Sequence, residues 1–130
     1  MTVIPWTTLD EVALSEYRDV VERTEFIFSP AGRMRKLRIH LLDGSFVDVW
    51  CSSKGDYSFH WERRFVNGSL YRHDNAPHAR WRYVPTFPKH FHNGQEDNVE
   101  SSFISDSHEE ALRDFLDFVR ERLAEIARQA

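Results

Sequence analysis

The last part of the chain carries the clearest hydrophobic pattern. Apolar residues recur there at helical spacing, at Leu112, Phe115, Leu116, Val119, Leu123 and Ile126. Ser107 and Glu110 stand three residues apart, the spacing of a capping box, so we expect a helix that begins there. Thr8 and Glu11 repeat this spacing near the start of the chain and predict an N-terminal helix. The apolar positions of that helix are Leu9, Val12, Ala13, Tyr17 and Val20.

The middle of the chain alternates apolar and polar residues with the period of two that half-buried strands show. Asp43-Gly44 and Asn67-Gly68 are two-residue turn signals that divide these segments into hairpins. The predicted strands are Glu25–Ser29, Lys36–Leu42, Phe46–Trp50, Tyr57–Val66 and Leu70–His73. In the second of them, Leu37, Ile39 and Leu41 share one face.

Beyond Asp74 the pattern changes, because three prolines make a regular central strand unfavourable. Val84–Phe87 and Lys89–His92 are expected as short edge strands or ordered loop, and Asn98–Ser105 as one more extended piece. The resulting prediction is an α+β fold. It consists of an antiparallel β-meander of four to six strands with an N-terminal and a C-terminal helix packed on it, and residues 1–130 form a single domain.

Composition sets the class of protein and its compartment. The chain has 130 residues, 29% of them charged, which is typical of one globular domain. Its single cysteine, Cys51, excludes an internal disulfide, suits a reducing cytosol and is expected as a small buried strand residue. No apolar run approaches the roughly 20 residues that span a bilayer, and the start lacks the pattern of a signal peptide. We therefore expect a cytoplasmic protein with no membrane association.

Charge is distributed unevenly along the chain. The segment His60–His92 holds six basic and two acidic residues and five of the seven histidines. From Asn93 onward there are ten acidic and four basic residues. The net charge of −4 argues against a protein that coats nucleic acid by charge alone, but it is compatible with an enzyme that holds one phosphodiester locally.

The stretch Tyr71–His92 reads YRHDNAPHARWRYVPTFPKHFH. Titratable and basic groups alternate in it with prolines, which fix the backbone, and with aromatic residues. A loop of this kind is stiff enough to aim its side chains, so this stretch is the predicted working surface.

One interpretation of this surface is metal-independent cleavage of RNA. The reaction needs a base for the 2′-hydroxyl, an acid for the leaving oxygen and a cation for the phosphate, and histidine and arginine supply such groups. We expect the proton-transfer residues to be Asp74, His78, His90 and His92. The expected substrate contacts are Arg72, Asn75, Arg80, Trp81 and Lys89, with Trp81 or Tyr83 stacking on a base.

A second interpretation is a metal site, because His90-x-His92 on an extended segment projects both imidazoles to one face. Such a spacing is common without metal, and no His-Glu-x-x-His signature is present. The favoured expectation is therefore no cofactor. A divalent metal at Asp74, His78, His90 and His92 is the alternative.

A third interpretation is a non-enzymatic module that binds a partner or nucleic acid with the same surface. The aromatic residues would then cover the sheet, and the histidines would be polar-capped aromatics. We assign three histidines to structural or solvated roles, namely His40, His60 and His108.

The segments Tyr71–His78 (YRHDNAPH) and Thr86–His92 (TFPKHFH) closely resemble the signature of the TumE-like proteins, small prokaryotic toxins of toxin–antitoxin pairs. The resemblance extends to Tyr57–Trp61 and to the stretch from Ile104 through the last helix. It departs at His73, Ala79 and Lys89, which argues against a functional role for His73 and against a complete metal cage. It implies a toxin encoded beside a DNA-binding antitoxin, with ribonuclease action as the usual assumption. The expected partners are this antitoxin, RNA as substrate and, as an open alternative, a second copy of the chain.

Overall fold

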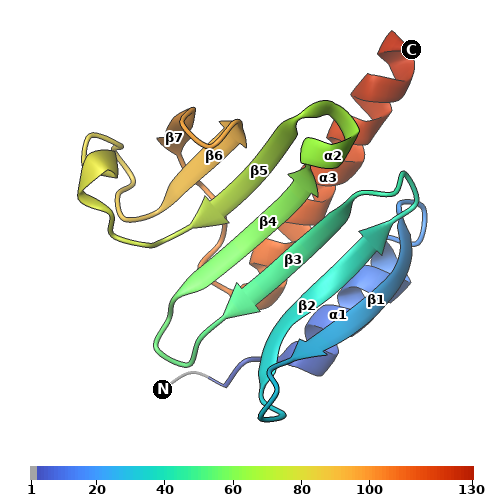
Figure 1. Cartoon of the computed structure of the whole chain (residues 1–130), viewed down its shortest axis with the longest axis horizontal. Coiled ribbons are helices and arrows are strands. Elements are labelled where there is room, and N and C mark those ends of the chain that lie inside the picture. Colours follow the sequence, from blue (N-terminus) through green and yellow to red (C-terminus); the bar gives the residue numbers. More distant parts are fainter. Residues whose placement is uncertain (1–2) are drawn as a thin grey trace.

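A computed structural model describes residues 3–130 as one antiparallel sheet with helices on one of its faces (Figure 1). The strands are β1 (Val21–Phe28), β2 (Met34–Leu41), β3 (Phe46–Cys51), β4 (Tyr57–Arg63), β5 (Ser69–Asp74), β6 (His90–Gly94) and β7 (Val99–Ser101). The helices are α1 (Trp6–Glu16), α2 (Arg64–Asn67), the 3-10 turn η1 (Ala79–Trp81) and α3 (His108–Gln129). Each strand pairs with the next along the chain. The predicted α+β meander is confirmed, with seven strands instead of four to six.

The alternation of apolar and polar residues decides which face of the sheet is covered. Leu37 of β2, Val49 of β3 and Phe59 of β4 lie on neighbouring rungs of the ladder and are buried in the main core. Apolar residues of α1 and α3 belong to the same core. Because successive side chains of a strand point to opposite faces, the other face receives the polar positions of these strands.

Helix α3 begins where the sequence predicts. The Ser107 hydroxyl accepts a hydrogen bond from the Glu110 N–H at 3.5 Å and caps the helix. Four residues of the predicted stripe are buried, namely Leu112, Phe115, Leu116 and Val119. Leu123 and Ile126 are only partly buried, since the end of the helix extends past the sheet (Figure 1). In residues 3–130 no helix is long and apolar enough to cross a membrane.

The predicted start of α1 is wrong. The helix begins at Trp6, so Thr8 lies inside its first turn and makes no capping bond. Pro5 occupies the N-cap position, and its carbonyl accepts the N–H of Leu9 at 2.9 Å. The proline ring fixes φ at a value compatible with helix entry, which replaces the side-chain cap.

Three strand predictions also need correction. Strand β1 begins at Val21, four residues before the predicted start at Glu25. Asn67-Gly68 is not a two-residue turn, because residues 64–67 form the short helix α2, which ends at Gly68 with a left-handed φ of 80°. Strand β6 is not an edge strand, since it pairs with both β5 and β7. Pro88 precedes its first residue and therefore removes no hydrogen bond from the ladder.

A buried hydrogen bond gives a test of this core. The Trp61 indole N–H donates to the Ser45 hydroxyl at 2.9 Å, and both side chains are buried. Ser45→Ala leaves the indole donor unpaired, and we expect it to lower the free energy of unfolding by about 1–3 kcal/mol in urea denaturation. The exposed Ser53→Ala is the matched control and should change it by less than about 0.5 kcal/mol. Equal effects of the two substitutions would contradict the assignment.

Cys51 gives a second test. It ends β3 as a buried core residue, as expected, and burial raises the pKa of its thiol from 9.0 to about 12. Only the thiolate reacts with iodoacetamide, so we expect alkylation of the native protein to be slower than that of the unfolded protein by about a thousandfold. Mass spectrometry of timed samples measures both rates, and comparable rates would show that the thiol is accessible.

Candidate functional site

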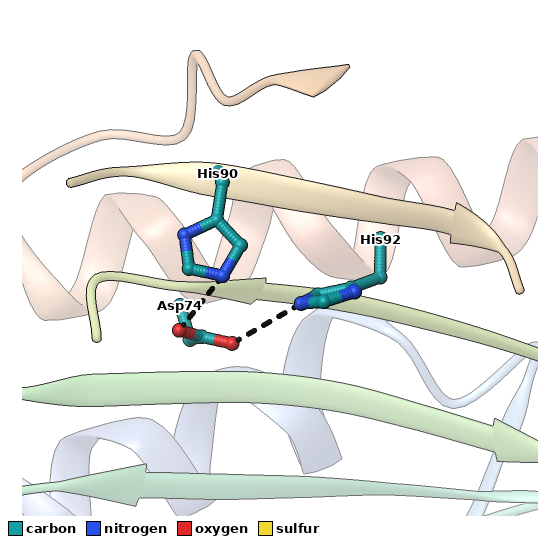
Figure 2. A group of neighbouring side chains, drawn as sticks. All are labelled: Asp74, His90 and His92. Atoms are coloured by element: carbon teal, nitrogen blue, oxygen red, sulfur yellow. Dashed lines mark ion pairs between the residues drawn. The ribbon is translucent and has the colours of Figure 1, made fainter. Parts of the chain in front are cut away.

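The uncovered face of the sheet brings polar side chains of β5 and β6 together. Arg72 pairs in register with His92, and Asp74 with His90. Residues two apart on a strand share a face, so these four side chains lie on two adjacent rungs. Figure 2 shows both imidazoles of β6 directed at the carboxylate of Asp74. The pattern His90-x-His92, visible in the sequence, produces this geometry because the segment is a strand.

The Asp74 carboxylate is the centre of the group. Its Oδ1 lies 3.1 Å from His90 Nε2, and its Oδ2 lies 3.6 Å from His92 Nε2 (Figure 2). It also accepts hydrogen bonds from the Ala76 N–H at 2.9 Å and from Arg72 Nε at 3.1 Å. Burial alone raises the pKa of Asp74, but the contacts with His92, Ala76, His90 and Arg72 outweigh it and lower the pKa to about 2. The group is therefore a carboxylate at neutral pH.

The two imidazoles are fixed from behind by main-chain carbonyls. His90 Nδ1 donates to the Pro88 oxygen at 2.8 Å, and His92 Nδ1 donates to the Glu96 oxygen at 2.7 Å. A carbonyl oxygen can only accept, so in both rings Nδ1 carries the hydrogen. In a neutral ring Nε2 then presents a lone pair toward Asp74, whereas in a protonated ring it presents a second N–H, the form in which His90 and His92 lower the pKa of Asp74. The buried His90 Nε2 has no hydrogen-bond partner among residues 3–130. Its 3.1 Å contact with Asp74 therefore lacks hydrogen-bond geometry.

A cavity of about 370 Å³ opens above this group. His90 and His92 are 1% and 2% exposed and lie at its floor, while His78 and Arg80 are exposed at its rim. Trp50, which is 41% exposed, also lines the cavity. Sequence reasoning missed Trp50, because it belongs to β3, and only the pairing of β3 with β4 brings it to the cavity.

The expected proton-transfer residues fall into two sets. Ligand atoms of Asp74, His90 and His92 lie within 4.8 Å of one another. His78 lines the same cavity but is exposed and stands outside this group. The backbone leaves the sheet after Asp74, which is why His78 is carried to the rim.

Three of the five expected substrate contacts are already engaged within the protein. Arg72 pairs with Asp74 and with Glu96. The side-chain amide of Asn75 accepts the Tyr57 N–H at 3.0 Å and donates to the Gly55 oxygen at 2.8 Å, which ties the loop to the β3–β4 turn. Lys89 donates to the Ile104 oxygen and to Asp106, and it lines a different cavity of about 460 Å³ that is also bordered by the start of α3.

The other two expected contacts lie together at the cavity. Trp81 is 7% exposed and packs against both imidazoles, with ring centroids 6.1 Å from His90 and 5.7 Å from His92. The Arg80 guanidinium lies over the indole, 4.6 Å from its centroid. No carboxylate pairs with Arg80 in the described part of the chain. Trp81 is thus a supporting wall, and Arg80 is the cation at the rim that can meet a ligand.

His73 lies on the opposite face from the site. Its ring stacks on Phe91 at 4.2 Å, and its Nδ1 lies 2.7 Å from the Ser102 hydroxyl. Burial, and secondarily the charge of Lys89, lowers the pKa of His73 to about 4. On the polar face, His60 contacts Glu62 and Arg72, and burial lowers its pKa as well. Both rings thus have packing or hydrogen-bond partners outside the central group.

Comparison with protein families places this geometry in context. Residues 9–123 match the model of the family described as Toxin TumE. Comparisons with curated proteins and with solved structures found no match. The matched region includes both histidine motifs and all of the sheet. Because it covers most of the chain, the protein belongs to the TumE toxin family.

Proposed function

We propose that the protein is the toxin component of a toxin–antitoxin pair and acts by cleaving RNA in the cavity above Asp74, His90 and His92. The observation that carries the proposal is the meeting of a buried carboxylate with two oriented imidazoles at the floor of an open cavity. Buried, mutually oriented titratable groups in a cleft are the usual setting of acid–base chemistry.

The chemistry of RNA cleavage suits the groups around this cavity. Attack by the 2′-hydroxyl requires removal of a proton, protonation of the leaving oxygen and stabilisation of charge on the phosphate. His90 and His92 offer imidazole nitrogens at the floor, and His78 offers a third at the rim. Arg80, which has no carboxylate partner among residues 3–130, supplies a planar guanidinium for phosphate oxygens.

Trp50 supports RNA as the class of substrate. Its partly exposed indole lies on the polar face next to the cavity, which is where a base flanking the cleaved bond would stack. Proteins recognise single-stranded RNA largely by such stacking. A single-stranded segment lying over β3 and β4 would place its phosphate near Arg80 and the imidazoles.

Two versions of the chemistry use the same residues. In the metal-free version, which the sequence favours, one proton is shared between Asp74 and an Nε2 atom, and the imidazoles exchange protons with the substrate. In the metal-dependent version, Asp74, His90 and His92 would hold a divalent ion, which would supply activation of the attacking group. An assay with a chelator distinguishes the versions.

The partner follows from the family. A toxin of this kind is encoded beside an antitoxin, and we propose that the antitoxin is a DNA-binding protein. An adjacent reading frame with a helix-turn-helix pattern is the observation that supports the pair.

Purified protein is expected to cleave single-stranded RNA, and the His90→Ala/His92→Ala double variant is expected to lose about 10²- to 10⁴-fold of this rate. Gel analysis of a labelled RNA, with and without EDTA, measures the effect. His40→Ala is the matched control, because His40 lies on the same face but contacts Glu25, far from the cavity. Asp74→Asn gives a second test if circular dichroism shows that the double variant does not fold.

Failure of this assay has a defined meaning. If the wild type cleaves no RNA under either condition, and a folded double variant remains toxic in cells, the ribonuclease proposal is wrong. The protein would then be a non-enzymatic module that binds a partner or nucleic acid through the Tyr71–His92 surface.

Trp50→Ala tests the position of the RNA. Loss of one base–aromatic stack is expected to weaken RNA binding by about 5- to 150-fold, with the cleaved position unchanged. Phe103→Ala is the matched control, since Phe103 is an exposed aromatic residue beside α3, outside the cavity. Fluorescence anisotropy with a labelled oligonucleotide measures both affinities, and equal affinities would exclude Trp50 from the substrate path.

A further inference from the structure

We infer that Asp74, His90 and His92 form a binding site for a divalent first-row transition metal, for which Zn²⁺ is a suitable probe. The inference rests on the same cavity as the proposed function and deepens it, since it names the ion through which these residues act. It reverses the preference for metal-free chemistry that the sequence alone favours.

The tautomers of the two histidines provide the first argument. Each Nδ1–H donates to a main-chain carbonyl, of Pro88 for His90 and of Glu96 for His92. This arrangement fixes the ring orientation and leaves Nε2 as the free lone pair, which is how metal-binding histidines are typically held. Both carbonyls belong to residues outside the central group, so the orientation does not depend on Asp74.

The unpartnered nitrogen of His90 provides the second argument. The ring is 1% exposed, yet its Nε2 has no hydrogen-bond partner within residues 3–130. A buried acceptor without a partner destabilises the folded chain, because it has lost its hydrogen bonds to water and gained none. Here the atom faces the carboxylate at 3.1 Å, so in the neutral ring two electron-rich groups are held together, and a proton or a metal cation between them makes the contact favourable.

The distances fit such a cation. Ligands that bind a tetrahedral zinc ion at 2.0–2.2 Å are about 3.3–3.5 Å from each other. Asp74 Oδ1 lies 3.1 Å from His90 Nε2, and the other oxygen, Oδ2, lies 3.6 Å from His92 Nε2, so each imidazole faces its own carboxylate oxygen at a distance close to this value. All three ligand atoms fall within 4.8 Å of one another, so a small displacement of side chains brings them onto one ion.

The charge of the cavity provides a further argument. Three carboxylates line it, from Asp56, Asp74 and Glu96, against two guanidinium groups, from Arg72 and Arg80. With neutral imidazoles the cavity therefore has a net negative charge, which repels a phosphodiester and attracts a cation. The guanidinium of Arg72 contacts both Asp74 and Glu96, so its positive charge is shared between two carboxylates. A bound divalent ion gives the cavity the positive charge that a phosphate requires.

The donor set indicates which ions fit. Two imidazoles and one carboxylate suit Zn²⁺ and its first-row neighbours, whereas Mg²⁺ and Ca²⁺ favour sites made wholly of oxygen. Three protein ligands with a remaining position open to a cavity are the arrangement of catalytic sites. When bound, the ion would polarise a phosphate oxygen and lower the pKa of a bound water. His78, exposed at the rim, would then be the histidine left for proton transfer.

The test is a titration of EDTA-treated, dialysed full-length protein with zinc sulfate in the absence of RNA. Isothermal titration calorimetry is expected to show one Zn²⁺ per chain, and thermal denaturation is expected to show a higher Tm with Zn²⁺ but not with Mg²⁺. Asp74→Asn keeps the shape of the side chain and is expected to weaken Zn²⁺ binding by about 100-fold or more. His92→Gln is a second variant with the same expected loss.

Two controls define the ligand set. His78→Gln removes the histidine at the rim and should leave Zn²⁺ affinity unchanged, because within residues 3–130 the converging group consists of Asp74, His90 and His92 without His78. His40→Gln removes a histidine elsewhere on the same face and should also leave it unchanged. Co²⁺ in place of Zn²⁺ is expected to give the strong visible absorption of a four-coordinate ion, which does not depend on any variant folding.

The outcomes separate this inference from the proposed function. Absence of stoichiometric Zn²⁺ binding by the wild type, or binding that survives both Asp74→Asn and His92→Gln in folded protein, overturns the metal site. Binding without any RNA cleavage overturns the ribonuclease proposal and leaves the metal site standing. In an RNA assay, the inference predicts that EDTA abolishes cleavage and that Zn²⁺ restores it. Cleavage that persists in EDTA shows that the reaction does not use the ion.

Discussion

The fold depends on one constraint, which is that both long helices cover the same face of a seven-stranded meander. Because side chains alternate along each strand, every residue directed at the helices leaves its neighbours on a face with no helix over it. The apolar set of β2, β3 and β4 fills the core beneath α1 and α3. The polar side chains of these strands therefore lie on the opposite face. There they form ion pairs with one another, such as those of Asp48 with Lys36 and Arg38. The candidate cavity is one region of that polar side.

Within this region, the site gains its rigidity from ladder hydrogen bonds rather than from loops. Asp74 ends β5, and the two histidines belong to β6, which is held between β5 and β7. Their main chains cannot move independently, so the geometry of carboxylate and imidazoles is fixed before any ligand arrives. The loop from Asn75 to Lys89 contributes further side chains to the cavity. Trp81 is buried, whereas Arg80 and His78 are exposed.

Much of this arrangement can be predicted from the sequence, because local periodicity reports which face a residue occupies. The stripe of α3, the alternation of β2 and the spacing of His90 and His92 each specify an element and an orientation. Pairing between strands is not local, and so Trp50, which comes 40 residues before His90 in the chain, is not predictable as a neighbour of the site. The hydrogen-bond partners of side chains cannot be predicted from the sequence either. Asn75 and Lys89 are examples, because each is hydrogen-bonded to groups that are distant in sequence and come near only in the folded chain. The prolines led to one wrong prediction, which was the edge position of β6. Pro88 lies before the strand, and a proline there is compatible with a central position in the sheet.

The positions of Trp81 and Trp50 decide which surfaces of the cavity a ligand can contact. The indole of Trp81, placed by the 3-10 turn, covers the two imidazoles from the loop side, while the side toward Trp50 is open. The cavity therefore has two different walls, a buried indole on the loop side and a partly exposed indole on the side of β3. For the proposed nucleic-acid substrate, the partly exposed indole of Trp50 offers a surface on which a base can stack, whereas Trp81, only 7% exposed, offers almost none.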